Sequence, residues 1–346
     1  MSGVVYPWQN DAWLELQRLR ARLPHAVLFH GAEGTGNAHF AERFAQSLLC
    51  ESPAADGHAC GTCISCGWFS NYAHPDYRRV RPEALDDEDG VDTDEGADAV
   101  EEKKTAKTAK APSRDIKIDQ VRALAGFTNI STHRQGKRVI LMYPAEALNG
   151  PAANALLKTL EEPPPETVFL MVSNSLDRLL PTILSRCRKF ALPMPGADVA
   201  LAWLASQNVK DADVWLAEQG GAPLLAVAAS EAGSRATMDD FLGQLAKPDI
   251  ESALKTAERL QKVPVTELVA WLQRWLHDVF SLKTSGRIRY YPRYELHITA
   301  VAGRTDLTRL MAAIKSAADR RAIAEHPLSA KLFIEDMLLE YASLFT

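Results

Sequence analysis

The sequence lacks any apolar run that approaches the length of a membrane-spanning helix, and residues 1–10 lack the pattern of a secretory signal. We therefore expect a cytoplasmic protein with no membrane partner. Cysteine is also scarce, with five in 346 residues. Without a secretory signal these thiols are expected to stay reduced, which favours metal binding or chemistry over disulfide bonds.

An excess of positive charge is missing as well. The formal net charge is -5, and residues 83–110 hold eleven acidic residues against four lysines. The rest of the chain is therefore close to neutral, so no basic field predicts nucleic-acid binding by the chain as a whole. Large apolar side chains are nearly absent from residues 83–112, which predicts a disordered insertion. A solvated spacer is favoured there over an acidic tether for a basic partner.

A glycine-rich loop stands between an apolar run and a helical stretch. Gly31, Gly34 and Gly36 fit a phosphate-binding loop, whose backbone N–H groups and following helix N-terminus hold phosphate. Such a loop also needs a lysine for the outer phosphates and a hydroxyl for magnesium. Here Asn37 and Ala38 occupy those two positions. The loop keeps the shape of a nucleotide site without its chemistry, and a plain tight turn is an equal alternative.

Four of the five cysteines, Cys50, Cys60, Cys63 and Cys66, fall within seventeen positions. Three thiols at two-residue intervals with a fourth nearby can surround one tetrahedral Zn²⁺. A closed set of four thiolates leaves no open coordination position, so we expect a structural zinc ion in a module over residues 50–66. An iron–sulfur cluster has compatible spacing, and buried free thiols are the plain structural alternative.

Alternating strand and helix patterns predict the fold of the first half. Buried strands are expected at 26–30, 139–142 and 167–172, and a helix over 151–162 that three prolines then stop. Such alternation indicates an α/β fold with a parallel sheet and helices on both faces.

Strand patterns disappear from Pro193 onward. Apolar stripes at helical spacing predict a small helical lid over 194–246 and an all-α domain over 247–346. Stripes of this kind are ordinarily core, and packing against another subunit is the functional alternative.

Two short segments carry a family resemblance. Residues 154–164 read NALLKTLEEPP, and Ser185-Arg186-Cys187 follows. Together they resemble the clamp-loader subunits of bacterial DNA polymerase III, which belong to the AAA+ superfamily. The four-cysteine module is similar to that family's zinc-binding insert. The resemblance implies an AAA+-type domain over 1–193, with the 83–112 insertion as a departure from the family pattern.

Within that family, the similarity is greatest to the member that does not hydrolyse ATP. Asn37 and Ala38 replace the phosphate-loop lysine and hydroxyl, and Tyr143 and Pro144 stand where an ATPase carries an acidic pair. Pro223 stands where a sensor arginine is expected. The resemblance therefore implies that this chain binds no ATP and is an accessory subunit without ATPase activity of its own.

The resemblance also implies partners and a role. The chain would join gamma/tau-type ATPase subunits and a delta subunit in a hetero-pentameric ring that places a sliding clamp on primed DNA. Arg186 would act in trans as an arginine finger on a neighbour's nucleotide, where positive charge speeds phosphoryl transfer. Taken without the resemblance, Arg186 reads as an ordinary exposed arginine. An autonomous clamp-loader ATPase and a zinc-dependent nucleic-acid-binding module are the two alternative functions.

Overall fold

The protein is described by a computed structural model, which divides into two compact units, Met1–Pro195 and Gly196–Thr346. The described residues are 4–89, 112–128, 132–133, 136–233, 235–324 and 329–345. Within these ranges no helix is both long and apolar enough to cross a lipid bilayer.

The first unit is built on a five-stranded parallel sheet in the order β2-β3-β4-β1-β5. Its strands are β1 (Ala26–His30), β2 (Tyr77–Val80), β3 (Arg138–Met142), β4 (Thr167–Ser173) and β5 (Arg188–Ala191). Its α-helices are α1 (Asn10–Leu19), α2 (Asn37–Leu49), α3 (Ile64–Ser70), α4 (Glu83–Asp89), α5 (Ile118–Thr128), α6 (Gly150–Glu161) and α7 (Pro181–Leu184). Its 3-10 turns are η1 (Pro7–Gln9), η2 (Arg20–Arg22), η3 (Ala145–Ala147) and η4 (Leu176–Arg178).

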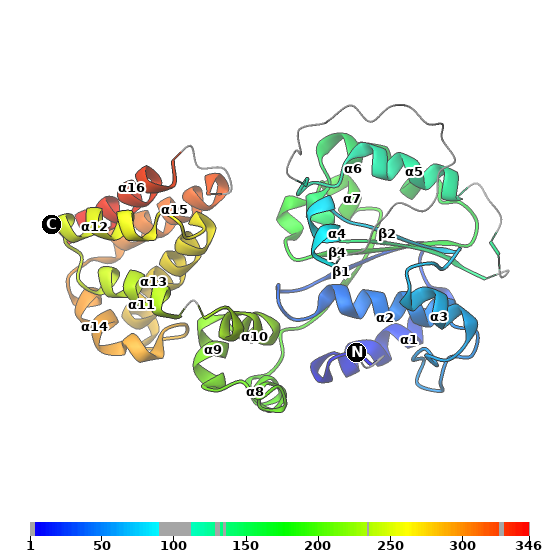
Figure 1. Cartoon of the computed structure of the whole chain (residues 1–346), viewed down its shortest axis with the longest axis horizontal. Coiled ribbons are helices and arrows are strands. Elements are labelled where there is room, and N and C mark those ends of the chain that lie inside the picture. The colour runs from blue at the N-terminus through cyan, green and yellow to red at the C-terminus, as the bar shows by residue number, and fades with distance from the viewer. Residues whose placement is uncertain are drawn as a thin grey trace. The chain divides into compact units, whose positions relative to one another are not determined.

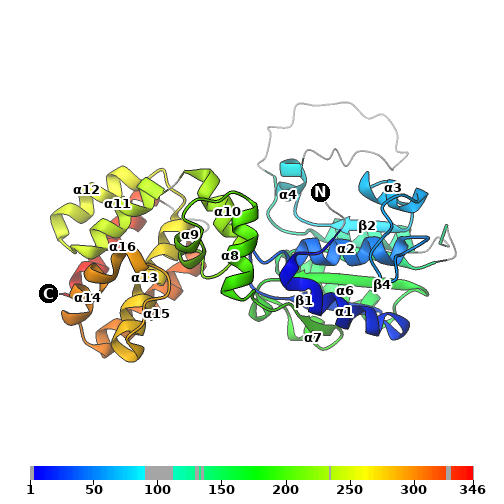
Figure 2. The same ribbon diagram turned by 90° about the horizontal axis from the view of Figure 1, so that it is seen from below.

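Helices cover both faces of this sheet, which confirms the predicted α/β class. One face packs against α1 and α2, which lie alongside the strands in Figure 2, and the other against α5, α6 and α7 (Figure 1). Along β1 the side chains alternate between these two cores, with Val27 and Phe29 in one and Leu28 in the other. Strand β2 was not predicted, because only its two end residues are buried and Arg78 and Arg79 stand between them.

The predicted disordered insertion over 83–112 begins with an ordered helix. Its first seven residues form helix α4 (Glu83–Asp89), whereas residues 90–111 lie outside the described part of the chain. Within α4, Asp86 forms an ion pair with the buried Arg81. Glu83 accepts a hydrogen bond from the backbone N–H of Ser113 and forms an ion pair with Lys117. These contacts offset the repulsion among like charges that motivated the prediction of disorder at 83.

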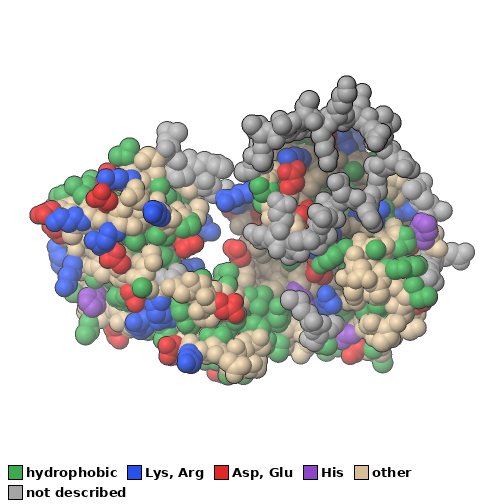
Figure 3. Space-filling model, viewed as in Figure 1, with side chains coloured by type: hydrophobic (Ala, Val, Ile, Leu, Met, Phe, Trp, Pro, Cys, Tyr) green, Lys and Arg blue, Asp and Glu red, His purple; other side chains and the backbone are tan. Residues whose placement is uncertain are grey.

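The second unit is entirely helical in the described residues. Its helices are α8 (Ala197–Ser206), α9 (Ala212–Glu218), α10 (Pro223–Ala232), α11 (Arg235–Ala246), α12 (Ile250–Leu260), α13 (Val265–Ser285), η5 (Pro292–Tyr294), α14 (Glu295–Gly303), α15 (Leu307–Ile323) and α16 (Ala330–Ser343). Figure 3 shows acidic and basic side chains interspersed over its visible face.

The boundary inside this unit lies earlier than residue 246. Helices α8, α9 and α10 share a small core, whereas Met238, Phe241, Leu242 and Leu245 of α11 belong to the larger core of α12 to α16. Helix α11 was assigned to the lid from its place in the sequence, but its apolar face packs with the C-terminal helices.

A buried carboxylate joins these two sets of helices. Glu218 ends α9, and its side chain is 1% exposed. It lies 3.4 Å from the Arg235 guanidinium of α11 and 4.0 Å from that of Arg293. Burial raises the pKa of Glu218 to about 7, although Arg235 and Arg293 partly oppose the shift.

This raised pKa predicts a pH-dependent stability that Glu218→Gln removes. Between pH 4.5, where an ordinary glutamate ionises, and about 7, the folded chain holds a proton that the unfolded chain has lost. The free energy of unfolding of wild type relative to Glu218→Gln should therefore fall by about 1–3 kcal/mol as pH rises through this window. Urea unfolding of both proteins near pH 5 and pH 8 tests this. An equal gap at both pH values would contradict it.

Candidate functional site

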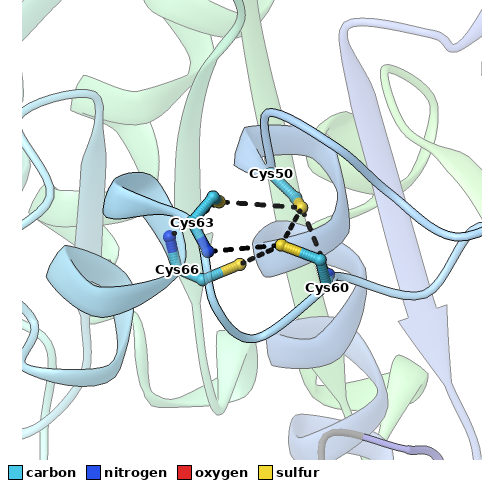
Figure 4. Close-up of side chains that lie close together, drawn as sticks. All are labelled: Cys50, Cys60, Cys63 and Cys66. Atoms are coloured by element: carbon cyan, nitrogen blue, oxygen red, sulfur yellow. Dashed lines mark hydrogen bonds between the residues drawn. The ribbon is translucent and has the colours of Figure 1, made fainter.

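The four clustered cysteines converge on one point in the structure. Cys50 follows the last residue of α2, Cys63 caps the N-terminus of α3, and Cys66 lies in its first turn. Figure 4 shows their sulfur atoms, with that of Cys60 from the preceding loop, turned toward one another. All four Sγ atoms lie within 4.8 Å of one another.

The spacing of these sulfur atoms fits a tetrahedral metal ion. The Sγ atom of Cys50 lies 3.5 Å from that of Cys60 and 3.9 Å from that of Cys63. The Sγ atoms of Cys60 and Cys66 are 4.0 Å apart. Four thiolates at the ordinary Zn–S distance define a tetrahedron with edges of about 3.8 Å. The cluster could therefore hold one metal ion.

Backbone N–H groups donate hydrogen bonds to sulfur atoms of this cluster, which favours their thiolate form. The N–H of Cys63 bonds to the Sγ of Cys60 at 3.4 Å, and the N–H of Cys66 bonds to the Sγ of Cys63 at 3.4 Å. Backbone N–H groups of Thr62 and Cys63 lower the pKa of Cys60 to about 6, whereas burial raises the pKa of Cys50 and of Cys66. Metal binding must displace the protons of the latter two thiols, so affinity should increase with pH.

The glycine-rich loop lies between β1 and α2, as the sequence predicted. Gly34 and Gly36 adopt φ of 74° and 85°, the left-handed region that favours glycine. Gly31 lies against the sheet, where an added Cβ would come within 2.5 Å of the Leu192 carbonyl oxygen. The loop therefore has the compact backbone of a phosphate-binding loop, joined directly to a helix N-terminus.

Inside this loop, the Asn37 side chain is hydrogen-bonded to protein groups. Its Nδ2 donates to the Ala32 carbonyl at 2.9 Å and to Oδ1 of Asn174 at 3.0 Å, and the Thr35 hydroxyl lies 3.0 Å from its Oδ1. Asn37 is 4% exposed and Thr35 1%. A flexible lysine at this position would extend toward phosphate, but the short amide is fixed to the loop and to the end of β4. The side chain at the lysine position is thus held within the loop and offers no cation to a phosphate.

Side chains of the N-terminal segment 6–9 contact the glycine-rich loop. The indole N–H of Trp8 donates to the Thr35 carbonyl at 2.8 Å, and the Gln9 amide donates to the Thr35 and Gly36 carbonyls, both at 3.0 Å. The Tyr6 ring stacks on Trp8 and leaves no room for a Cβ at Gly36, which would lie 2.5 Å from it. Sequence reasoning assigned this segment no part in the site, because nothing in its pattern identifies distant backbone carbonyls as its partners.

Tyr143 and Pro144 follow β3, at the positions where an ATPase carries an acidic pair. The Tyr143 hydroxyl donates to Glu42 of α2 at 3.3 Å and accepts from Arg81 at 3.3 Å. Burial and the Glu42 carboxylate raise the pKa of Tyr143 to about 12, so the phenol stays protonated and cannot serve as a metal ligand near neutral pH. Pro144 offers no side-chain ligand, and Pro223 begins α10 rather than presenting a charge.

Arg186 directly follows the short helix α7 and Ser185. Its guanidinium donates to the Thr182 carbonyl at 2.9 Å and to the Ser185 hydroxyl at 3.3 Å, and pairs with Glu161 of α6. The side chain is 32% exposed, whereas the neighbouring Cys187 is buried, with its thiol 3.8 Å from the Met171 sulfur. The Ser-Arg-Cys motif thus anchors one side chain in the core and leaves the arginine accessible.

Comparison with known proteins identifies a matching family and several related sequences. Residues 9–195 match the protein family described as DNA polymerase III, delta subunit. DNA polymerase III subunit delta' of Pseudomonas aeruginosa is 37% identical over 293 residues, 83% of this chain and 78% of that protein. The proteins of the same name from Haemophilus influenzae and Escherichia coli are 30% and 32% identical, covering 81% and 61% of this chain and 78% and 56% of their own lengths.

The missing lysine and hydroxyl at Asn37 and Ala38 predict that the isolated chain does not bind ATP with micromolar affinity. The double variant Asn37→Lys with Ala38→Thr should still show no turnover, because Tyr143 and Pro144 supply no carboxylate for magnesium or water. Titration calorimetry with Mg-ATP and a phosphate-release assay test the two statements. Asn37→Ala, which removes the amide without adding a cation, is the matched control. Micromolar binding by wild type, or hydrolysis by the double variant, would refute the prediction.

Proposed function

The chain belongs to the DNA polymerase III delta' subunit family, and we propose that it serves as the non-hydrolysing subunit of a clamp loader. In this role it joins gamma/tau-type ATPase subunits and a delta subunit in a five-membered ring. The ring uses ATP to open a sliding clamp and place it on primed DNA in the cytoplasm. The chain itself contributes to a DNA polymerase holoenzyme without hydrolysing nucleotide.

The observation that carries this proposal is the contrast between the chain's own nucleotide loop and its exposed arginine. Asn37 is bonded within the loop, and Tyr143 replaces a carboxylate, so the groups that would cleave a bound nucleotide are missing. Arg186, by contrast, stands accessible on the same α/β unit. This contrast supports a role in which the chain assists a neighbour's ATPase site.

The chemistry of Arg186 suits that role. A guanidinium stays charged at every physiological pH and presents several N–H donors in one plane, which match phosphate oxygens better than the point charge of lysine. Positive charge placed on a transferring phosphoryl group accelerates hydrolysis by about 10³- to 10⁵-fold in known arginine-finger systems. We assign Arg186 this function in the active site of an adjacent subunit.

The four-cysteine cluster supports a structural zinc ion. Zn²⁺ accepts four thiolates in a closed tetrahedron, and the sulfur spacing of Cys50, Cys60, Cys63 and Cys66 has those dimensions. Bound there, the ion would join the end of α2 to α3 and stabilise the segment between them. No position remains open for a substrate, so the centre takes no part in hydrolysis.

Removing Arg186 should therefore slow the whole complex without disturbing its assembly. Arg186→Ala is expected to lower DNA-stimulated ATP hydrolysis at the site it serves by at least about 10²-fold, because transition-state charge loses its partner. Arg186→Lys should recover only part of the rate, since charge returns without the planar fork. The measurement compares reconstituted complexes of equal subunit stoichiometry.

The matched control is Arg178→Ala, which removes an exposed arginine that makes no ion pair in the described residues. It should leave the ATPase rate and clamp loading unchanged. A normal rate with Arg186→Ala would remove Arg186 from the mechanism. Hydrolysis by the chain alone would instead favour the autonomous ATPase.

Zinc binding is tested by metal analysis of the purified chain. We expect one equivalent of zinc in the wild-type chain. The substitutions Cys60→Ser and Cys63→Ser should each remove the zinc, and residues 50–66 should then lose their protection from proteolysis. Cys187→Ala, which removes the fifth cysteine, should keep the full zinc content. An iron chromophore, or full protection in metal-free protein, would contradict the assignment.

A further inference from the structure

Arg186 is held by a carboxylate from the other family motif. Glu161, the last residue of α6, lies in the segment NALLKTLEEPP, and its Oε1 pairs with Nη2 of Arg186. The two residues are 25 positions apart in sequence. The structure thus joins the two motifs through one ion pair, which the sequence alone did not indicate.

The position of Glu161 is unfavourable for helix α6 itself. The C-terminus of a helix carries partial negative charge, so cations are preferred there and carboxylates are disfavoured. Glu161 nevertheless ends α6, and the only basic side chain in the last turn is Lys158. Local helix stability therefore does not explain this residue, whereas its ion pair with Arg186 does.

Both partners stand on a rigid base. Leu160, which precedes Glu161, is 1% exposed, and Ile183 and Cys187 beside Arg186 are 0% and 8% exposed. All three belong to the hydrophobic core on the face of the sheet that packs against α5, α6 and α7. The backbone positions that carry the carboxylate and the guanidinium are therefore fixed relative to each other by packing.

The bonds to Arg186 leave part of its guanidinium available. Nη1 donates to the Thr182 carbonyl and the Ser185 hydroxyl, and Nη2 donates to Glu161. Within the described ranges no acceptor bonds its Nε–H. Three acceptors therefore favour one conformation of the long side chain, and its Nε–H is not buried.

We propose that Glu161 is a positioning residue that holds Arg186 in the conformation from which it reaches a neighbour's nucleotide. The inference rests on the proposed function of Arg186. Fixing a flexible arginine before the neighbour binds removes much of the entropy that docking on phosphate would otherwise cost. The pair is partly exposed, at 32% and 50%, so it favours one arginine conformation and is still weak enough for the guanidinium to exchange Glu161 for phosphate.

The test uses complexes reconstituted with variant chains at saturating ATP and primed DNA. Glu161→Ala should lower kcat by about 3- to 10-fold with KM for ATP unchanged, because the arginine is misplaced only where chemistry occurs. Glu161→Gln keeps an oxygen acceptor and should stay within about twofold of wild type. Glu162→Ala is the matched control, since it removes an adjacent exposed carboxylate that forms no ion pair in the described residues.

A double-variant comparison separates this inference from the function on which it rests. Glu161→Ala combined with Arg186→Ala should be no slower than Arg186→Ala alone, because the carboxylate acts through the arginine. If Arg186→Ala is slow but Glu161→Ala equals Glu162→Ala, the positioning role is refuted and the finger stands. If Glu161→Ala is faster than wild type, the carboxylate restrains the arginine instead. If Arg186→Ala is itself normal, the proposed function has failed.

Discussion

Pairing of β1 on both sides is the constraint on which the first unit depends. Its residues Val27, Leu28 and Phe29 are at most 2% exposed, and its backbone bonds to β4 on one side and β5 on the other. Because both registers are fixed, the loop after β1 emerges between the ends of those two strands. Asn174 and Leu192, which follow β4 and β5, therefore meet the loop from opposite sides. The sheet register therefore sets where this loop lies.

The features that the sequence predicted well depend on short spacings. The cysteines that converge lie within seventeen positions, and β1, β3, β4 and α6 have apolar patterns of the correct period. Side-chain contacts between residues far apart in the sequence could not be predicted. Periodicity tells which face of an element is apolar, but not that Trp8 donates to Thr35 or that Glu161 meets Arg186. The same ambiguity misplaced α11, whose stripe suits either of two neighbouring cores.

The cysteine module illustrates how a segment with little core can still have a defined structure. Between α2 and α3 the chain has few buried apolar side chains, so hydrophobic burial alone gives it little stability. Trp13 of α1 holds the loop by stacking on His58 at 4.3 Å between ring centroids and by donating to the Asp56 carbonyl at 3.0 Å. The cysteine cluster fixes the other end. A metal ion bound there would add a cross-link to a segment that has few buried apolar side chains.

A subunit that binds no nucleotide lacks the stabilisation of the folded state that ligand binding confers. A ligand at a concentration well above its dissociation constant stabilises the folded state by several kcal/mol, and an empty loop would leave buried polar groups unsatisfied. In this chain Asn37 bonds within the loop, and Trp8 and Gln9 cover its carbonyls, so protein groups take the place of ligand contacts. Under the proposed function, these internal contacts would hold the loop in one conformation while neighbouring subunits bind and release nucleotide. Arg186, carried on the same α/β unit, would then keep its position in each of those states.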